Sequence, residues 1–403
     1  MRRVLAAVLA VLAALPATAL AAPSVRAPSA ILVEPATGDI VFERNASQER
    51  AIASTTKLMT ALVTLENASL DDVMTTIDYR ANPAESLGGF RAGERVTVRD
   101  LMRALLLASA NDAAATLATR VAGSRPAFVR LMNKRARELG LKHTHFANPV
   151  GLDDPRNYSS ATDLVKLTLI LRKRAFFRET TDLPRATIGA GSRRRVVYNR
   201  NRLVQRVPAV NGVKTGHTLQ AGYVLVGSAT RDGVTVLSAV LGTPSEAARD
   251  ADSLELLRYG LGRYRVATAV EKGQVLGRAA LAHRDEHVDL VAPRTVRRTA
   301  RKGERLRVRV SGAPGELDGP LKAGARVGTI VVLQRGREVA RMPLVTARAV
   351  DAATFGERLS EWLGRGSTLV LLAAFAACSL YLVLLRRRAV RRRARRARGA
   401  PVA

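Results

Sequence analysis

The first 265 residues combine two hydrophobic periodicities, which predicts a mixed α/β (α+β) domain. Residues 30–33 and 40–42 are short strand-like runs on either side of a turn, and they predict a β-hairpin. Residues 223–229 and 234–241 are longer β-rich runs that meet at Asp232-Gly233, and they predict a second hairpin.

Between and after the hairpins, apolar residues recur at helical spacing. The pattern predicts helices that begin near Ser54 and Thr97 and further helices over 111–121, 126–139, 160–171 and 252–261. Residues 71–77 look like one more strand. We therefore expect residues 22–265 to form one domain that contains both sheet and helices.

The sequence pattern changes beyond about residue 266, where short β-rich segments alternate with turns. We expect an all-β domain over 266–348 and a juxtamembrane linker over 349–366. Residues 367–385 are uncharged and span roughly 28 Å as a helix, about one hydrocarbon core. A basic tail, 386–403, follows directly.

Residues 1–21 are typical of a secretory signal peptide, with Arg2 and Arg3, an apolar run and an Ala-x-Ala cleavage site. The arginine-rich tail predicts a cytoplasmic C-terminus and an extracytoplasmic globular part. We thus expect a single-pass protein of the cell membrane. The only cysteine, Cys378, lies in the predicted span, so no intramolecular disulfide is possible.

The formal net charge of +31 first suggests a nucleic-acid partner. Two of the arginines lie in the leader and nine in the tail, which leaves about +20 for the domains between them. These domains contain few aromatic residues to stack on bases. We therefore expect no nucleic acid.

Ser54 and Lys57 stand at the start of the first predicted helix, three residues apart and on the same face. A serine hydroxyl is a good nucleophile only when a base takes its proton. A lysine can be that base if burial or a second cation lowers its pKa from about 10.4. The pair alone is also common on solvated helix faces, so its meaning depends on the rest of the chain.

Two further motifs are equally ambiguous when taken alone. Ser109 and Asn111 fall at a junction between helices, where they could simply cap both. Lys214, Thr215 and Gly216 lie on or just before a strand, and a glycine at a strand end needs no function.

Together and in this order, the three motifs resemble the signature of the serine penicillin-recognising enzymes. Over roughly residues 30–344 the chain is similar to the low-molecular-mass penicillin-binding proteins, the serine D-alanyl-D-alanine carboxypeptidases of peptidase family S11. The segments that carry the likeness are 52–60, 148–152, 199–203, 212–218, 221–223, 320–324 and 328–330. The resemblance implies a serine β-lactamase/transpeptidase-like domain with an antiparallel sheet flanked by helices, followed by a small all-β domain.

The resemblance also implies a catalytic set of Ser54, Lys57 and Ser109. Ser54 would attack the carbonyl between two D-alanines of a peptidoglycan stem peptide, and Lys57 would accept its proton. Ser109 would relay protons toward the leaving amine. Water would then hydrolyse the acyl-enzyme, whereas a β-lactam would acylate Ser54 and leave slowly.

The implied substrate-binding set is Asn111, Lys214, Thr215, Gly216, His217 and Thr218. Asn111 would hydrogen-bond the substrate backbone and Lys57, while Lys214 would help to keep Lys57 neutral and would attract the terminal carboxylate. Hydroxyl groups of Thr215 and Thr218 would bind the terminal carboxylate. Backbone N–H groups of Ser54 and His217 would form the oxyanion hole.

One position departs from the expected pattern. Many relatives carry an arginine for the substrate carboxylate about where Thr235 stands, and a threonine cannot form that ion pair. This departure favours one alternative, a catalytically weak penicillin-binding scaffold. A transpeptidase and a β-lactamase are the others, although the Glu-x-x-Leu-Asn segment of class A β-lactamases does not occur between Asn111 and Lys214.

We therefore expect peptidoglycan stem peptides as substrates, β-lactams as inhibitors and the cytoplasmic membrane as an anchor. The chain shows no Cys/His spacing of a metal site, and we expect no metal or other cofactor. The sequence indicates no particular oligomeric state.

Overall fold

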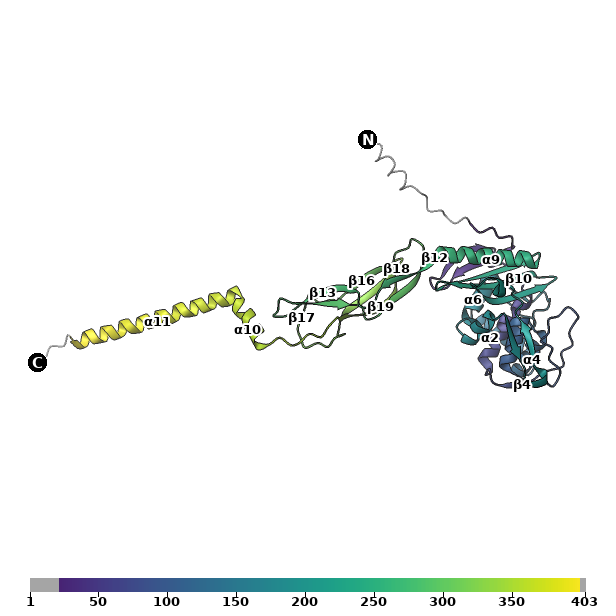
Figure 1. Cartoon of the computed structure of the whole chain (residues 1–403), viewed down its shortest axis with the longest axis horizontal. Coiled ribbons are helices and arrows are strands. Elements are labelled where there is room, and N and C mark those ends of the chain that lie inside the picture. The colour runs from purple at the N-terminus through teal and green to yellow at the C-terminus, as the bar shows by residue number, and fades with distance from the viewer. Residues whose placement is uncertain (1–21, 399–403) are drawn as a thin grey trace, which may run out of the picture. The chain divides into compact units, whose positions relative to one another are not determined.

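A computed structural model describes residues 22–398 of the chain (Figure 1). The predicted signal peptide, 1–21, and the last five residues of the predicted tail lie outside the described residues. The chain divides into two compact units. The first runs to Val266 and includes Arg298–Glu304, and the second comprises the other residues from Ala267 onward.

A five-stranded antiparallel sheet organises the first unit, with strand order β2-β1-β11-β10-β9. Its strands are β1 (Ser29–Glu34), β2 (Asp39–Arg44), β9 (Val210–Thr218), β10 (Gly222–Arg231) and β11 (Val234–Thr243). Both predicted hairpins are confirmed. All six residues of β1 are buried, and Ile31 and Leu32 belong to two different hydrophobic cores. The sheet is therefore covered on both faces.

Helices supply the two covers (Figure 1). One face carries α9 (Glu246–Arg263), and the other carries a helical layer that contacts the sheet through α6. The long helices of that layer are α2 (Lys57–Asn67), α4 (Asn111–Ala122), α5 (Arg125–Glu138) and α6 (Ala161–Leu171). This arrangement confirms the predicted fold class.

The start of α9 differs from the prediction. The helix begins at Glu246 rather than at residue 252, and the Ser245 hydroxyl accepts a hydrogen bond from the backbone N–H of Ala248. A serine that caps the helix and an acidic first residue are a recognised start signal. The extra turns bring residues 246–251 into a regular helix next to the end of β11.

Shorter elements connect these layers. They are β3 (Arg50–Ala51), η2 (Ala53–Thr56), β4 (Val73–Thr75), β5 (Arg95–Thr97), α3 (Val98–Arg103), the π-helical turn η3 (Ala104–Ala108), β6 (Tyr158–Ser159), α7 (Ala175–Asp182), β7 (Arg185–Ile188), η4 (Gly191–Arg193), β8 (Arg195–Tyr198) and α8 (Leu203–Arg206). The strand expected over 71–77 is only three residues long. The helix expected near Thr97 is α3, which Thr97 caps.

The second unit has its own sheet and its own hydrophobic core, which confirms the predicted all-β domain. The six-stranded sheet has the order β16-β18-β19-β14-β13-β17. The strands from residue 264 onward are β12 (Tyr264–Val270), β13 (Val275–Leu281), β14 (His287–Val291), β15 (Val296–Arg301), β16 (Arg307–Ser311), β17 (Glu316–Leu317), β18 (Arg326–Gln334) and β19 (Arg337–Thr346).

Two helices follow the second sheet. In α10 (Phe355–Gly364) the side chains of Thr354 and Glu357 form a capping box at the first turn. The last helix, α11 (Gly366–Arg398), contains the predicted span. Among the described helices it is the one long and apolar enough to cross a membrane, which makes it a candidate anchor.

Candidate active site

Ser54 lies in the short helix η2, directly before α2, and is the half-exposed residue in an otherwise buried stretch. Apolar residues of α2 such as Leu58 and Leu62 bury the helix in the core, which takes the Lys57 side chain inside with it. The Lys57 Nζ donates a hydrogen bond of 2.9 Å to the Ser54 Oγ and a second one to the Val150 carbonyl. The predicted pair is thus in contact, with a buried amine next to a partly exposed serine.

Burial lowers the pKa of Lys57 from its ordinary 10.5 to about 7. The negative charges of Glu85 and Asp112 act in the opposite direction and raise this pKa. An amine with a pKa near 7 is largely unprotonated slightly above neutral pH, and it can then accept a proton from Ser54.

The Val150 carbonyl belongs to a loop that closes over the base. The Asn148 Oδ1 accepts hydrogen bonds from the backbone N–H groups of Val150 and Gly151, at 3.2 and 2.6 Å. Gly151 has a φ of +87°, and a Cβ there would stand 2.1 Å from the Ala53 carbonyl oxygen and 3.0 Å from the Ser54 Cα. Only glycine lets this loop pass so close to the Ser54 backbone.

Ser109 and Asn111 lie where η3 ends and α4 begins. Ser109 is 4% exposed and adopts a left-handed conformation with φ of 62°, which is unusual for a residue with a side chain. Its Oγ accepts a hydrogen bond of 2.9 Å from the Lys214 Nζ. The site therefore contains two serine–lysine contacts, Ser54 with Lys57 and Ser109 with Lys214.

The contact of Asn111 differs from the expected one. Its Nδ2 donates to the Glu85 Oε2 at 2.6 Å, while Lys57 donates to Ser54 and Val150. Burial alone would raise the pKa of Glu85, but hydrogen bonds from Tyr79 and Asn111 outweigh it and keep that pKa below the usual value. Glu85 is therefore an ionised carboxylate that positions Asn111.

Lys214 is fully buried on β9, between Ser109 and the Thr215 carbonyl. Burial lowers its pKa well below the ordinary value, and the positive charges of Lys57, Arg200 and Arg249 lower it further. Because two buried cations repel each other, the pair favours a state in which only one lysine is charged.

Strand β9 is held tightly against η2. A Cβ at Gly216 would stand 3.0 Å from the Ile52 carbonyl oxygen and 3.1 Å from the Ser54 backbone nitrogen. The absence of a side chain at Gly216 thus lets the Lys-Thr-Gly strand approach the backbone of the nucleophile.

The remaining predicted residues lie along β9 beyond Lys214. Thr215 is buried, and His217 is exposed and stacks on Tyr223, with ring centroids 4.0 Å apart. The Thr218 Oγ1 accepts a hydrogen bond from the backbone N–H of Ala221, which anchors the turn into β10. All three lie at the end of β9 that faces the start of β10.

Thr235 lies away from this site. It pairs with Thr230 at the turn of the β10–β11 hairpin, where the two hydroxyls are 2.9 Å apart. Lys214 pairs with Val226 of β10. Val226 and Thr230 are four residues apart, about 13 Å at the usual rise of a strand. The inference that Thr235 occupies the position of a carboxylate-binding arginine was therefore wrong.

Arg249 supplies a cation that the sequence reasoning missed. It lies in the first turns of α9, is 4% exposed and forms ion pairs with Glu246 (3.1 Å) and Asp250 (2.7 Å). Its charge reaches Lys214, whose pKa it lowers. The start signal at Ser245 could have placed Arg249 in a helix near the end of the sheet, whereas the prediction began α9 six residues too late.

Glu85 and the Val150 carbonyl were also missed, for a different reason. Glu85 stands in an irregular loop, and a backbone carbonyl has no residue type that would mark it. Only the folded chain brings them to Asn111 and Lys57. In the part of the chain that the structure describes, no group of three or more His, Cys, Asp or Glu side chains is placed to hold a metal ion.

Comparison with known proteins gives matches over most of the chain. Residues 16–245 match a family model described as D-alanyl-D-alanine carboxypeptidase, and residues 264–352 match the C-terminal domain of penicillin-binding protein 5. The D-alanyl-D-alanine carboxypeptidase DacD of Escherichia coli (strain K12) is 33% identical over 357 residues, which cover 84% of this chain and 91% of that protein.

Two solved structures show the same similarity. Penicillin binding protein 5 from Haemophilus influenzae is 30% identical, with a TM-score of 0.60 over 83% of this chain and 100% of that one. The Streptomyces K15 DD-transpeptidase is 33% identical, with a TM-score of 0.57 over 60% of this chain and 100% of its own.

Proposed function

Because the chain belongs to the D-alanyl-D-alanine carboxypeptidase family (peptidase family S11), we propose that it removes the terminal D-alanine from peptidoglycan stem pentapeptides through an acyl-enzyme on Ser54. The observation that carries this proposal is the 2.9 Å contact between the Ser54 hydroxyl and a buried Lys57, whose pKa is about 7. A hydroxyl beside a largely neutral amine is an activated nucleophile.

In the acylation step, Ser54 attacks the carbonyl between the two D-alanines while its proton passes to the Lys57 Nζ. The backbone N–H groups of Ser54 and His217 stabilise the oxyanion, a contribution often worth about 3–4 kcal/mol. The C–N bond then breaks, and the proton that Lys57 has taken up passes through Ser109, which accepts a hydrogen bond from Lys214, to the leaving amine, so that Lys57 is neutral again. Free D-alanine departs and the rest of the peptide remains as an ester on Ser54.

In the deacylation step, a water molecule gives a proton to the neutral amine of Lys57 and its hydroxyl attacks the ester carbon. The Ser54–acyl bond breaks, and the serine oxygen recovers a proton from Lys57. The product is a stem peptide that is shorter by one alanine. A β-lactam ring would follow the same first step and form a slowly hydrolysed ester.

The terminal carboxylate of the substrate requires a permanent positive charge. Lys214 is poorly suited to supply it alone, because burial and the charge of Lys57 lower its pKa. Arginine stays charged in any environment and binds carboxylates through two N–H groups. We assign this carboxylate to Arg249, where it would replace Glu246 or Asp250 as an ion-pair partner, together with the hydroxyls of Thr215 and Thr218.

Helix α11 would anchor the enzyme in the membrane, with the catalytic unit outside the cytoplasm. The arginines that follow residue 385 support a cytoplasmic C-terminus. The test is protease treatment of spheroplasts that carry the protein with a C-terminal epitope tag. The tag should stay on a short protected fragment. Digestion of the tag would show that the C-terminus lies outside the cytoplasm and would contradict the proposed topology.

Two assays on the full-length protein test the reaction. It should release D-alanine from a pentapeptide ending in D-Ala-D-Ala, and mass spectrometry of the products separates hydrolysis from transpeptidation. Fluorescent penicillin should label the wild type but not the Ser54→Ala variant. Equal labelling of the two would exclude Ser54 as the nucleophile, rapid loss of the label would favour a β-lactamase, and labelling without peptide turnover would favour a scaffold.

A further inference from the structure

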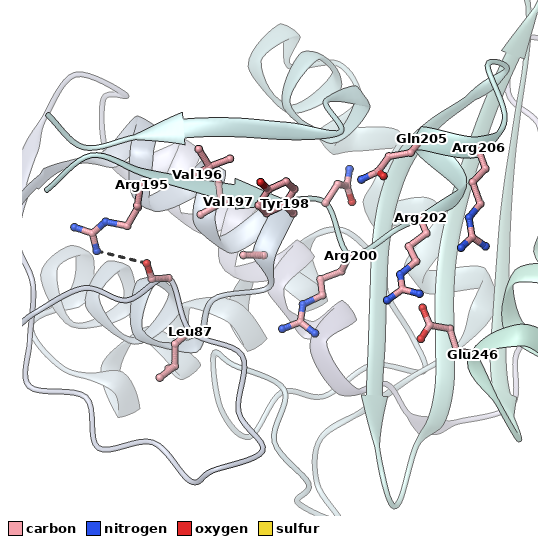
Figure 2. A pocket seen from close by; sticks show the side chains of 13 residues that line it. Leu87, Arg195, Val196, Val197, Tyr198, Arg200, Arg202, Gln205, Arg206 and Glu246 are labelled. Atoms are coloured by element: carbon pink, nitrogen blue, oxygen red, sulfur yellow. Dashed lines mark hydrogen bonds between the residues drawn. The ribbon is translucent and has the colours of Figure 1, made fainter.

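A cavity of about 660 Å³ is lined by arginines (Figure 2), and Ala108, which precedes Ser109, also lines it. We call it the arginine pocket and define it by Arg195, Tyr198, Arg200, Arg202, Arg206 and Glu246. Four cations and one anion give it a strongly positive lining. None of these residues has a part in the acylation and deacylation steps above.

Three of the arginines have no ion-pair partner among the described residues. The Arg195 guanidinium pairs with Glu94, so its charge is neutralised. Arg200, Arg202 and Arg206 are exposed, and no described carboxylate lies within ion-pair distance of them. Glu246 pairs with Arg249. The pocket thus presents several unneutralised guanidinium groups to one solvent-filled space, which favours an anionic ligand.

The segment that carries Arg200 and Arg202 is held in place by hydrogen bonds from two asparagines. Asn199 donates to the carbonyls of Thr181 (3.1 Å) and Leu183 (2.9 Å), and Asn201 donates to the Gly212 carbonyl (3.0 Å). Both asparagines are buried, so the residues between and beside them face outward. Arg200 and Arg202 extend from the same side of this segment in Figure 2. Such preorganisation lowers the entropic cost of binding.

The arginine pocket borders segments that lead into the candidate active site. Ala108 lines the pocket and directly precedes Ser109, and Gly88 lines it close to Ser86, whose carbonyl accepts from the Asn111 N–H at 2.8 Å. The charge of Arg200 reaches Lys214. The pocket is therefore next to the segments that carry Ser109 and Asn111 and within electrostatic reach of Lys214.

We propose that the arginine pocket binds carboxylate groups of the stem peptide upstream of D-Ala-D-Ala. The inference rests on the proposed function. The substrate ends one residue after the scissile bond, and its terminal carboxylate is assigned to Arg249, so a second anionic group must come from the upstream side. Three extended residues reach about 10 Å, enough to leave the catalytic cleft.

The test compares two pentapeptides, Ala-γ-D-Glu-diaminopimelyl-D-Ala-D-Ala with both upstream carboxyl groups free, and the same peptide with both amidated. The wild-type full-length protein should cleave the free acid with a kcat/KM about tenfold higher, because each charge-assisted hydrogen bond contributes to binding. This preference should decrease as salt is raised.

The double variant Arg202→Gln, Arg206→Gln should lose most of the preference for the free acid and keep the wild-type kcat/KM for the amidated peptide. Arg200 is left intact because its charge also acts on Lys214. Arg194→Gln, an exposed arginine of the same region outside the pocket, is the matched control and should retain the full preference. Fluorescent penicillin should label all three proteins equally.

Either of two kinetic results would overturn the inference: equal kcat/KM of the wild type for both peptides, or an equal loss for both in the double variant. Calorimetric binding of the two peptides to full-length Ser54→Ala protein repeats the comparison without turnover. A preference for the free acid in that experiment, without hydrolysis by the wild type, would reject the proposed reaction while supporting the pocket. Weak binding of both peptides alongside tight binding of a polyphosphate would point to a cell-envelope polymer and reject the inference.

Discussion

Two neighbouring regions of the first unit carry positive side chains, and water reaches only one of them. Lys57 and Lys214 are buried, and burial is the first cause of the lowered pKa of both. Arg200, Arg202 and Arg206 of the arginine pocket are exposed, and a guanidinium group in water stays charged. The first region can therefore gain and lose a proton near neutral pH, whereas the second keeps its charge.

The difference matches the chemistry of the two residue types. Lysine has a compact ammonium group whose pKa responds strongly to desolvation, which suits proton transfer. Arginine has a delocalised charge and a planar set of donors, which suits carboxylate recognition. Arg249 lies between the two cases, since it is buried but paired with Glu246 and Asp250.

The most direct test of this contrast is to replace the proposed base, Lys57, by a residue that keeps its positive charge permanently. Lys57→Arg keeps a positive charge but cannot accept a proton, so acylation by fluorescent penicillin should fall by about 10²–10⁴-fold. Lys57→Met, which fits the buried site without a charge, should fall by a similar factor. Circular dichroism checks that both variants are folded, and substantial labelling of either folded variant would mean that another group is the base.

A second variant disturbs the loop that packs against Lys57 and the Ser54 backbone. Gly151→Ala would place a Cβ 2.1 Å from the Ala53 carbonyl oxygen, so the loop or the Ser54 backbone must move. A displacement of about 1 Å at the reacting atoms can cost roughly 10²-fold, and we expect a loss of this size in the acylation rate.

Gly93→Ala, in a different loop, is the matched control for this substitution. Gly93 has a similar φ of +78° but open space around it. The substitution should cost only the backbone strain, about 1–2 kcal/mol, and leave acylation unchanged. Equal effects of the two alanines on acylation would show that strain rather than the contact with Ser54 is responsible.

A third variant separates the two carboxylate positions considered above. Arg249→Gln should reduce kcat/KM for a D-Ala-D-Ala peptide by about ten- to a hundredfold, since hydrogen bonds to charged groups contribute about 1.5–3 kcal/mol. Thr235→Val should leave kcat/KM unchanged, because Thr235 contacts Thr230 at the far turn. The opposite result would restore Thr235 as the relevant position.

Local patterns in the sequence predict much of the fold and of the candidate site. The β10–β11 hairpin has its own turn signal at Asp232-Gly233, and Ser54 and Lys57 meet because they are one helical turn apart. Strand order is not local, since β1 pairs with β11 more than 200 residues later. The predicted sheet therefore gave no basis for placing Arg249 near Lys214.

The contacts that set the electrostatic environment of the site also join residues that are far apart in the sequence. Glu85 reaches Asn111 from a loop without periodicity, and the Val150 carbonyl reaches Lys57 across 93 residues. The motif residues could be predicted because each belongs to a short pattern. Their electrostatic environment could not, since it depends on which loops the fold brings against them.

The smallest predicted effect tests this environment directly. Glu85 raises the pKa of Lys57, so Glu85→Gln should lower that pKa further. Since the base must be neutral, the acylation rate of the wild type should fall as pH decreases through about 7, and the variant should keep its activity to lower pH. Glutamine retains an acceptor for Tyr79 and Asn111, which limits structural change.

Glu138→Gln, on the exposed end of α5, is the control and should leave the pH profile unchanged. A profile of Glu85→Gln that shifts to higher pH would show that Glu85 acts through the position of Asn111 rather than through its charge, and the contrast between a proton-exchanging lysine and permanently charged arginines would then need a different physical basis.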